Sequence, residues 1–138
     1  MRLYFDACAI IYGIEGAPPV REAALRFVEQ AEATSDGLVI TSQLSRLECR
    51  VKPLRDGAMD VLARFDAFFS RHRLLLAEVS AGVIERATEL RAQHGFKTPD
   101  AIHLATALVQ AADVFLTGDA GLRRCPGLRV VVLDPDAR

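Results

Sequence analysis

Two acidic residues stand directly after apolar runs that have the length of strands. Asp6 follows the run 3–5, and Asp119 follows the run 114–117 with one glycine between them. Ligand sites of parallel α/β sheets lie beyond the carboxyl ends of the strands, so these two carboxylates are candidates for one shared site. Taken singly, each is equally well explained as a residue that begins a turn or caps a helix.

Glu48 lies on the apolar stripe of a predicted helix. Helical periodicity over residues 42–51 places Leu44, Leu47 and Val51 on one face, and Glu48 falls among them. An acid on an apolar face must be paired, protonated or bound to a metal. A salt bridge to a core arginine is the alternative explanation of its position.

Asp100 falls in the first turn of another predicted helix. We expect this helix to begin with Thr98 as its cap and Pro99 at the first helical position, and to run to about residue 112. Asp100 aligns with the leucines four and eight positions later, and the helix dipole favours an anion there. A surface acid that only complements the dipole is the alternative. His103 could face the same site, but a lone histidine is more often a structural hydrogen-bonding residue.

Together the four carboxylates come from four separate predicted elements. Like charges within a few ångströms repel one another and raise one another's pKa, so such a cluster is tolerable chiefly when a cation neutralises it. Oxygen donors without His or Cys favour Mg²⁺ or Mn²⁺ over zinc. A hard divalent cation suits phosphoryl chemistry, because it activates water and stabilises charge on the phosphate oxygens.

Short apolar runs alternate with helical patterns along the chain. The predicted strands cover residues 3–5, 38–40, 73–77, 114–117 and 130–133, and the other predicted helices cover 20–33, 59–69 and 83–93. Continuous apolar runs indicate strands that are covered on both faces. We therefore expect an α/β fold in one domain spanning residues 1–138. It should be a three-layer αβα sandwich around a mostly parallel sheet of four to five strands.

Composition excludes several classes of protein. The chain has 138 residues, of which 51% are hydrophobic and 25% charged, as in ordinary globular proteins and unlike disordered chains. No apolar run approaches the ~20 residues of a membrane-spanning helix, and an acid at position 6 comes too early for a signal peptide. We therefore expect a cytoplasmic protein with no membrane partner. A net charge of −1 argues against nucleic-acid binding by bulk attraction.

Four segments resemble the PIN-domain family, and within it the VapC-type toxins of prokaryotic toxin–antitoxin pairs. They are Leu3–Tyr12, Ser45–Glu48, Thr98–Ala107 and Phe115–Asp119. Each motif is weak alone, whereas all four in the family's order and spacing are fairly specific. The resemblance covers essentially the whole chain and implies a Rossmann-like sheet with the acids gathered at one end.

The resemblance also implies roles for individual residues. It places the catalytic and metal-binding acids at Asp6, Glu48, Asp100 and Asp119. Asp6 and Asp100 would be the main metal ligands, and Asp119 would complete the site directly or through water. Glu48 would bind a second metal or orient a water. Thr117 matches the hydroxyl residue often found before the last acid, and would position phosphate or water.

The implied activity is that of a Mg²⁺- or Mn²⁺-dependent endoribonuclease. A metal-activated water would attack the phosphodiester in line and leave a 5′-phosphate and a 3′-hydroxyl. The implied partners are an RNA substrate, a cognate antitoxin protein and a second copy in a homodimer. The alternatives are a non-catalytic PIN-like module that binds RNA or protein, and a housekeeping RNA-processing nuclease. A phosphatase of the haloacid-dehalogenase type would need an acid where Cys8 stands.

Two further segments carry hypotheses of their own. Arg123 and Arg124 follow Asp119 closely, so we expect them to contact the RNA backbone. Residues 61–69 hold several large apolar side chains. These side chains indicate either ordinary core packing or an exposed groove for a dimer mate or an antitoxin helix.

Overall fold

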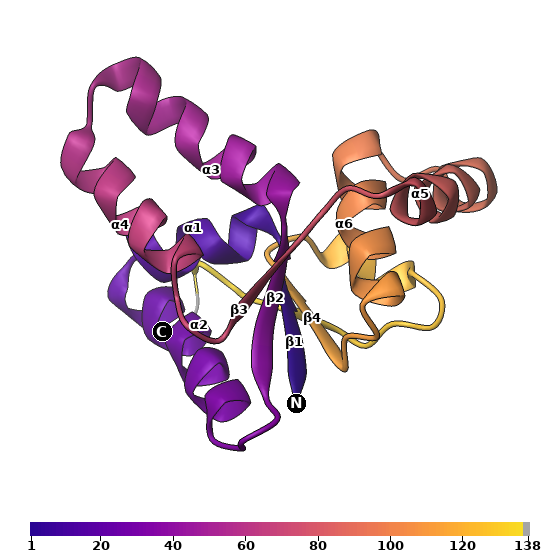
Figure 1. Cartoon of the computed structure of the whole chain (residues 1–138), viewed down its shortest axis with the longest axis horizontal. Helices are drawn as coiled ribbons and strands as arrows, with labels where there is room; N and C mark the ends of the chain where they lie inside the picture. Colours follow the sequence, from indigo (N-terminus) through magenta and orange to yellow (C-terminus); the bar gives the residue numbers. More distant parts are fainter. Residues whose placement is uncertain (137–138) are drawn as a thin grey trace.

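The computed structural model describes residues 1–136, with helices on both faces of a central sheet (Figure 1). The strands are β1 (Arg2–Phe5), β2 (Leu38–Ser42), β3 (Leu74–Ala77), β4 (Val114–Thr117) and β5 (Val130–Val132). The helices are α1 (Ala7–Glu15), α2 (Pro18–Glu32), α3 (Gln43–Asp56), α4 (Met59–Phe69), α5 (Ala81–His94), α6 (Thr98–Val109) and the 3₁₀ helix η1 (Ala120–Arg124). This arrangement confirms the predicted α/β sandwich. Within the described range, no helix is long and apolar enough to cross a membrane.

The sheet is parallel throughout, with β1 at its centre. The strand order is β3-β2-β1-β4-β5, and every neighbouring pair runs in the same direction. The chain therefore builds outward from β1 to β3, and then returns to place β4 on the other side of β1. In open parallel sheets, ligands bind at the point where the strand order reverses, outside the carboxyl ends of the strands. Here that point lies between β1 and β4.

The alternation of side chains along β1 divides the core between two helical layers. Leu3 and Phe5 belong to a buried cluster with residues of α1, α2 and α4, whereas Tyr4 belongs to a cluster with residues of α5 and α6. Successive side chains of a strand point to opposite faces of a sheet, so this division follows from the strand geometry. Figure 1 shows the same two layers, with α1 to α4 on one side of the sheet and α5 and α6 on the other.

Helix α1 was not among the predicted elements, although it carries the end of the first motif. It begins directly after β1, and Asp6 is its N-cap residue, with the side chain accepting a hydrogen bond from the Ala9 amide. No turn residues separate the strand from the helix. The short apolar run and the helical pattern therefore merge in the sequence.

The predicted inward face of α3 is wrong. Leu47, Val51 and Leu54 are 61%, 51% and 53% exposed, while the small side chains of Ser45 and Cys49 face the core. The Ser45 hydroxyl lies in a buried hydrogen-bonded pair with a threonine of β2. The leucines of α3 predicted the wrong face. The buried face carries small residues, because these allow α3 to pack closely on its neighbours. The apolar stripe is left on the surface.

The start of α6 also differs from the prediction. Lys97 occupies the N-cap position without a side-chain cap bond, and Thr98 and Pro99 are the first two helical residues. Proline fits there because the first amides of a helix have no partner inside the helix. The helix ends at Val109, before the predicted residue 112.

Helix α4 resolves the alternative left open for residues 61–69. Phe65 is buried, and Phe68 and Phe69 are partly buried against the same core cluster as Phe5. The Phe68 ring lies 6.1 Å from the Phe5 ring, between ring centroids. These aromatic residues therefore belong to ordinary core packing.

Candidate active site

Asp6 and Thr117 meet at the carboxyl ends of the two central strands. Phe5 of β1 is paired with Leu116 of β4, so the residues that follow them, Asp6 and Thr117, lie side by side. The Thr117 hydroxyl donates to Oδ2 of Asp6 at 2.5 Å, and Oδ1 of Asp6 accepts from the Ala9 amide at 2.9 Å. Asp6 is only 5% exposed. Burial raises the pKa of its carboxyl, although both hydrogen bonds and the His103 ring oppose that shift.

Thr117 also connects Asp6 to Asp119. Its hydroxyl oxygen accepts from the Asp119 amide at 3.1 Å, and Oδ1 of Asp119 accepts from the Gly121 amide at 2.8 Å. Asp119 therefore caps η1, which was the alternative explanation of its position. It also lies beside the site. Gly118, which lies between Thr117 and Asp119 in the sequence, packs against α1, where a Cβ at this position would come within 2.6 Å of the Cys8 sulfur. A glycine is therefore required for this loop to lie so close to α1.

Removing the Thr117 hydroxyl is expected to destabilise the protein. Thr117→Val leaves the buried Asp6 carboxyl without one donor and the Asp119 amide without its acceptor. The expected loss is about 1–3 kcal/mol in the free energy of unfolding, measured by urea denaturation. Thr117→Ser keeps the hydroxyl and serves as the matched control. Equal stability of the valine and serine variants would contradict this role for the hydroxyl.

Asp100 lies at the start of α6 and faces the same edge of the sheet. Its pKa is raised, first by partial burial and then by the negative charge of Asp119, while Glu48 adds to the shift and His103 opposes it. Asp100 in turn raises the pKa of Asp6. Electrostatic effects of this kind fall off with distance, so Asp100 lies within electrostatic range of Asp6, Asp119 and Glu48.

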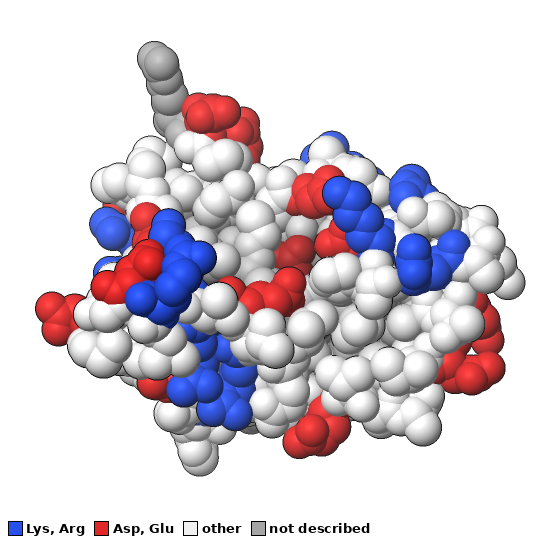
Figure 2. All heavy atoms as spheres, turned by 90° about the horizontal axis from the view of Figure 1, so that it is seen from above, with Lys and Arg blue, Asp and Glu red and all other residues white. Residues whose placement is uncertain are grey.

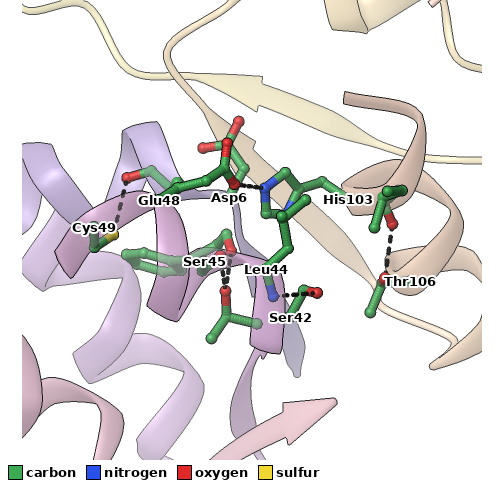
Figure 3. A network of polar contacts seen from close by, with 12 residues as sticks. Asp6, Ser42, Leu44, Ser45, Glu48, Cys49, His103 and Thr106 are labelled. Carbon is green, nitrogen blue, oxygen red and sulfur yellow. Dashed lines mark hydrogen bonds and ion pairs between the residues drawn. The ribbon is translucent and has the colours of Figure 1, made fainter. Parts of the chain in front are cut away.

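Glu48 reaches the cluster from α3 and is paired with His103 of α6. The Nε2 atom of His103 lies 2.6 Å from Oε1 of Glu48, and its Nδ1 atom lies 2.7 Å from the Tyr4 hydroxyl. Figure 3 shows Glu48 and His103 pointing toward one another, with Asp6 beside them. The alternative of a core arginine as the partner of Glu48 is wrong, because the partner is this histidine. No sequence pattern links position 48 to position 103, since the two residues meet only in the folded chain.

The structure thus brings the predicted site residues to one edge of the sheet. Viewed from above that edge, acidic side chains occupy the middle of the face and basic side chains flank them on both sides (Figure 2). Among residues 1–136, no three His, Cys, Asp or Glu side chains stand close enough together to hold a metal ion as they are. Two of the acids are turned to other partners, Glu48 to His103 and Asp119 to the start of η1.

The two arginines after Asp119 differ in their surroundings. The Arg124 guanidinium lies 3.9 Å over the ring of Phe96 and donates to the carbonyl of His94. Arg123 is exposed, and it forms no ion pair within the described part of the chain. Arg124 is therefore held against the end of α5, and contact of either arginine with RNA stays a prediction.

Arg124→Ala is expected to weaken RNA binding at every sequence tested. If the guanidinium contacts one phosphate, the slope of log K against log salt falls by about 1. The measurement is a salt titration of binding to a fluorescent RNA with the Asp100→Asn variant, which prevents cleavage. Arg124→Lys keeps the charge and should keep most of the slope. An unchanged slope for Arg124→Ala would exclude the contact.

Comparison with known proteins is consistent with this arrangement of acids at the sheet edge. A family model described as PIN domain matches residues 3–128, which is most of the chain. The chain belongs to the PIN-domain family. The predicted family resemblance is therefore confirmed. A search of curated proteins returned no match.

Solved structures of a toxin and of toxin–antitoxin complexes share this PIN fold. VapBC2 from Rickettsia felis, bound to a promoter DNA fragment, superposes with a TM-score of 0.77 at 19% identity, covering 97% of this chain and 100% of that one. A toxin–antitoxin complex from Klebsiella pneumoniae gives 0.71 at 24% identity, covering 96% and 97%. VapC20 from Mycobacterium tuberculosis, a Sarcin-Ricin loop cleaving toxin, gives 0.65 at 18% identity, covering 87% and 92%. At these identities the likeness shows the fold.

Proposed function

We propose that this PIN-domain protein is a Mg²⁺- or Mn²⁺-dependent endoribonuclease, the toxin of a toxin–antitoxin pair. The observation that carries the proposal is the cluster of Asp6, Asp100, Asp119 and Glu48 at the strand-order reversal. The raised pKa of Asp6 and of Asp100 supports it, because carboxyls held together and partly desolvated gain most from a bound cation. The neighbouring toxin structures support the biological setting.

The donors of the cluster fit a hard divalent cation in type and in charge. They are carboxylate oxygens, and the Cys8 thiol beside them has a pKa raised by burial and by Asp6, so it stays protonated and is a poor ligand. Asp6 and Asp100 would hold the ion, with Asp119 completing the site directly or through water. When bound, the ion would supply activation of water and neutralisation of phosphate charge.

The chain's own residues prepare this site. Hydrogen bonds from Thr117 and the Ala9 amide fix both oxygens of Asp6, while each oxygen keeps a lone pair for a ligand. Glu48 is placed to orient a water or to contribute to a second ion. Basic side chains on both sides of the acidic centre would attract the RNA backbone without a strongly positive protein (Figure 2).

Two partners belong to the proposal, a cognate antitoxin and a second copy of the chain. The antitoxin is supported by the neighbouring structures, which were determined as toxin–antitoxin complexes. The exposed apolar stripe of Leu47, Val51 and Leu54 on α3 offers a candidate interface for the homodimer. Light scattering of the purified protein measures the oligomeric state, and a monomer at micromolar concentration would exclude the homodimer.

Cleavage of total bacterial RNA by the purified protein tests the proposed activity. The reactions contain EDTA, Mg²⁺ or Mn²⁺, and run beside Asp100→Asn as a matched control. We expect discrete fragments with 5′-phosphate ends that require the metal and the aspartate. No cleavage with any metal, in both total RNA and RNA from the source cells, would favour the alternative of a binding module.

A further inference from the structure

His103 forms a polar connection between the two halves of the molecule at the site. Glu48 stands on α3, in the helical layer of α1 to α4, and His103 stands on α6 in the opposite layer (Figure 1). Their hydrogen bond of 2.6 Å therefore joins the two helical layers. His103 is 3% exposed, and the side chain of Glu48 is 30% exposed. The histidine is therefore buried, while the carboxylate that it holds faces the site.

The proton positions in this contact follow from the chemistry of the three groups. An ionised carboxylate only accepts hydrogen bonds, so Nε2 of His103 carries the hydrogen and donates to Glu48. The Tyr4 hydroxyl is fully buried, and burial raises its pKa and keeps it as the neutral phenol. Its single hydrogen is available to Nδ1 of His103 at 2.7 Å. When the imidazole is neutral, donation from Tyr4 to Nδ1 selects the tautomer in which Nε2 is the donor.

The surroundings of Tyr4 fix the orientation of the histidine ring. The Tyr4 ring stacks on Phe115 of the neighbouring strand, with centroids 5.0 Å apart and an interplanar angle of 9°. It also meets the His103 ring edge-on, with centroids 5.9 Å apart. Tyr4 is thus held by the central strands, His103 is held by Tyr4, and Glu48 is held by His103.

We propose that His103, oriented by Tyr4, is a positioning residue that holds Oε1 of Glu48 and leaves Oε2 directed to the acidic site. A glutamate on an exposed helix face would otherwise sample several rotamers, and ordering it costs conformational entropy at each binding event. A fixed carboxylate is preorganised for a metal ion or a water. This inference rests on the proposed nuclease function.

The inference predicts a loss of metal affinity when the hydrogen bond is removed. His103→Leu replaces the imidazole with an apolar side chain of similar size and should raise the Mn²⁺ Kd roughly 10- to 100-fold, as is usual for residues that orient a ligand. His103→Gln can place an amide N–H near Glu48 and should recover most of the affinity. Tyr4→Phe keeps the stacked ring and should weaken binding less, in the same direction. Mn²⁺ binding is measured by electron paramagnetic resonance of the free ion, without RNA.

Controls separate positioning from general damage to the fold. His72→Leu and His72→Gln make the same changes at an exposed histidine in the turn before β3, and should leave the Mn²⁺ Kd unchanged. Circular dichroism and thermal unfolding identify variants that fail to fold. If His103→Leu is one of them, Tyr4→Phe and His103→Gln still carry the test. Cleavage at saturating Mn²⁺ then shows whether the loss lies in metal binding or in turnover.

The outcomes distinguish this inference from the proposed function. Folded His103→Leu and Tyr4→Phe variants that bind Mn²⁺ as tightly as the parent would overturn the positioning role and leave the nuclease intact. Failure of His103→Gln to recover affinity would also overturn it, because the imidazole would then act in another way. A folded parent protein that neither binds Mn²⁺ nor cleaves RNA would instead overturn the proposed function.

Discussion

Asp6→Asn is expected to reduce RNA cleavage by about 10²- to 10³-fold, the range measured when one charge-stabilising group is removed from an active site. The substitution removes the negative charge and keeps the shape of the side chain. The introduced carboxamide oxygen can still accept from the Ala9 amide, and the introduced NH₂ group can still donate to the Thr117 hydroxyl oxygen. The loss is therefore expected in a folded protein.

Stability measurements make this prediction sharper. Burial raises the pKa of the Asp6 carboxyl, so its ionised form opposes folding at neutral pH, and the neutral amide should not lower the free energy of unfolding. Urea denaturation at pH 7 compares the two proteins without metal. Glu29→Gln, an exposed acid on α2, is the matched control and should retain full activity. Full activity of Asp6→Asn would remove this aspartate from the catalytic site.

Without metal, the stability gained by Asp100→Asn is expected to grow as the pH rises from about 4 through the raised pKa of Asp100, and then to level off. The pKa of Asp100 is raised in the folded protein by burial and by Asp119, so the native state holds its proton more tightly than the unfolded chain. The free energy of unfolding therefore falls as the pH rises from the ordinary aspartate value, about 4, through the raised value. The Asp100→Asn variant lacks this pH-dependent loss, so the difference in the free energy of unfolding between the two proteins widens.

Divalent cations should reverse the difference in the free energy of unfolding between the parent protein and Asp100→Asn. At a concentration 100 times its Kd, Mn²⁺ or Mg²⁺ stabilises the parent protein by about 2.7 kcal/mol if it binds only the folded state. Asp100→Asn, which lacks one of the proposed ligands, should gain much less. Urea denaturation over this pH range, with EDTA and with Mn²⁺, measures both effects. A parent protein that Mn²⁺ leaves unchanged would contradict the metal site.

Much of the fold and the main candidate residues can be predicted from local sequence patterns. All five strands were predicted, because apolar runs covered on both faces stand out from the amphipathic helices between them. Asp6 and Asp119 were candidates because each follows a strand, and the parallel order brings strand ends together. Their roles as ligands stay predictions, whereas their shared position beside Thr117 is a feature of the structure.

Other features depended on the tertiary structure. The buried face of α3 could not be predicted from its leucines, because close packing selects small residues such as Ser45 and leaves Leu47 outside. The contact between Glu48 and His103 joins two helices on opposite faces of the sheet, 55 positions apart in the chain. Periodicity along one element contains no information about such a pairing. The sequence alone determined which strands form and which acids follow them, while the fold decided which partner each acid meets, because only the assembled sheet sets the distances between elements.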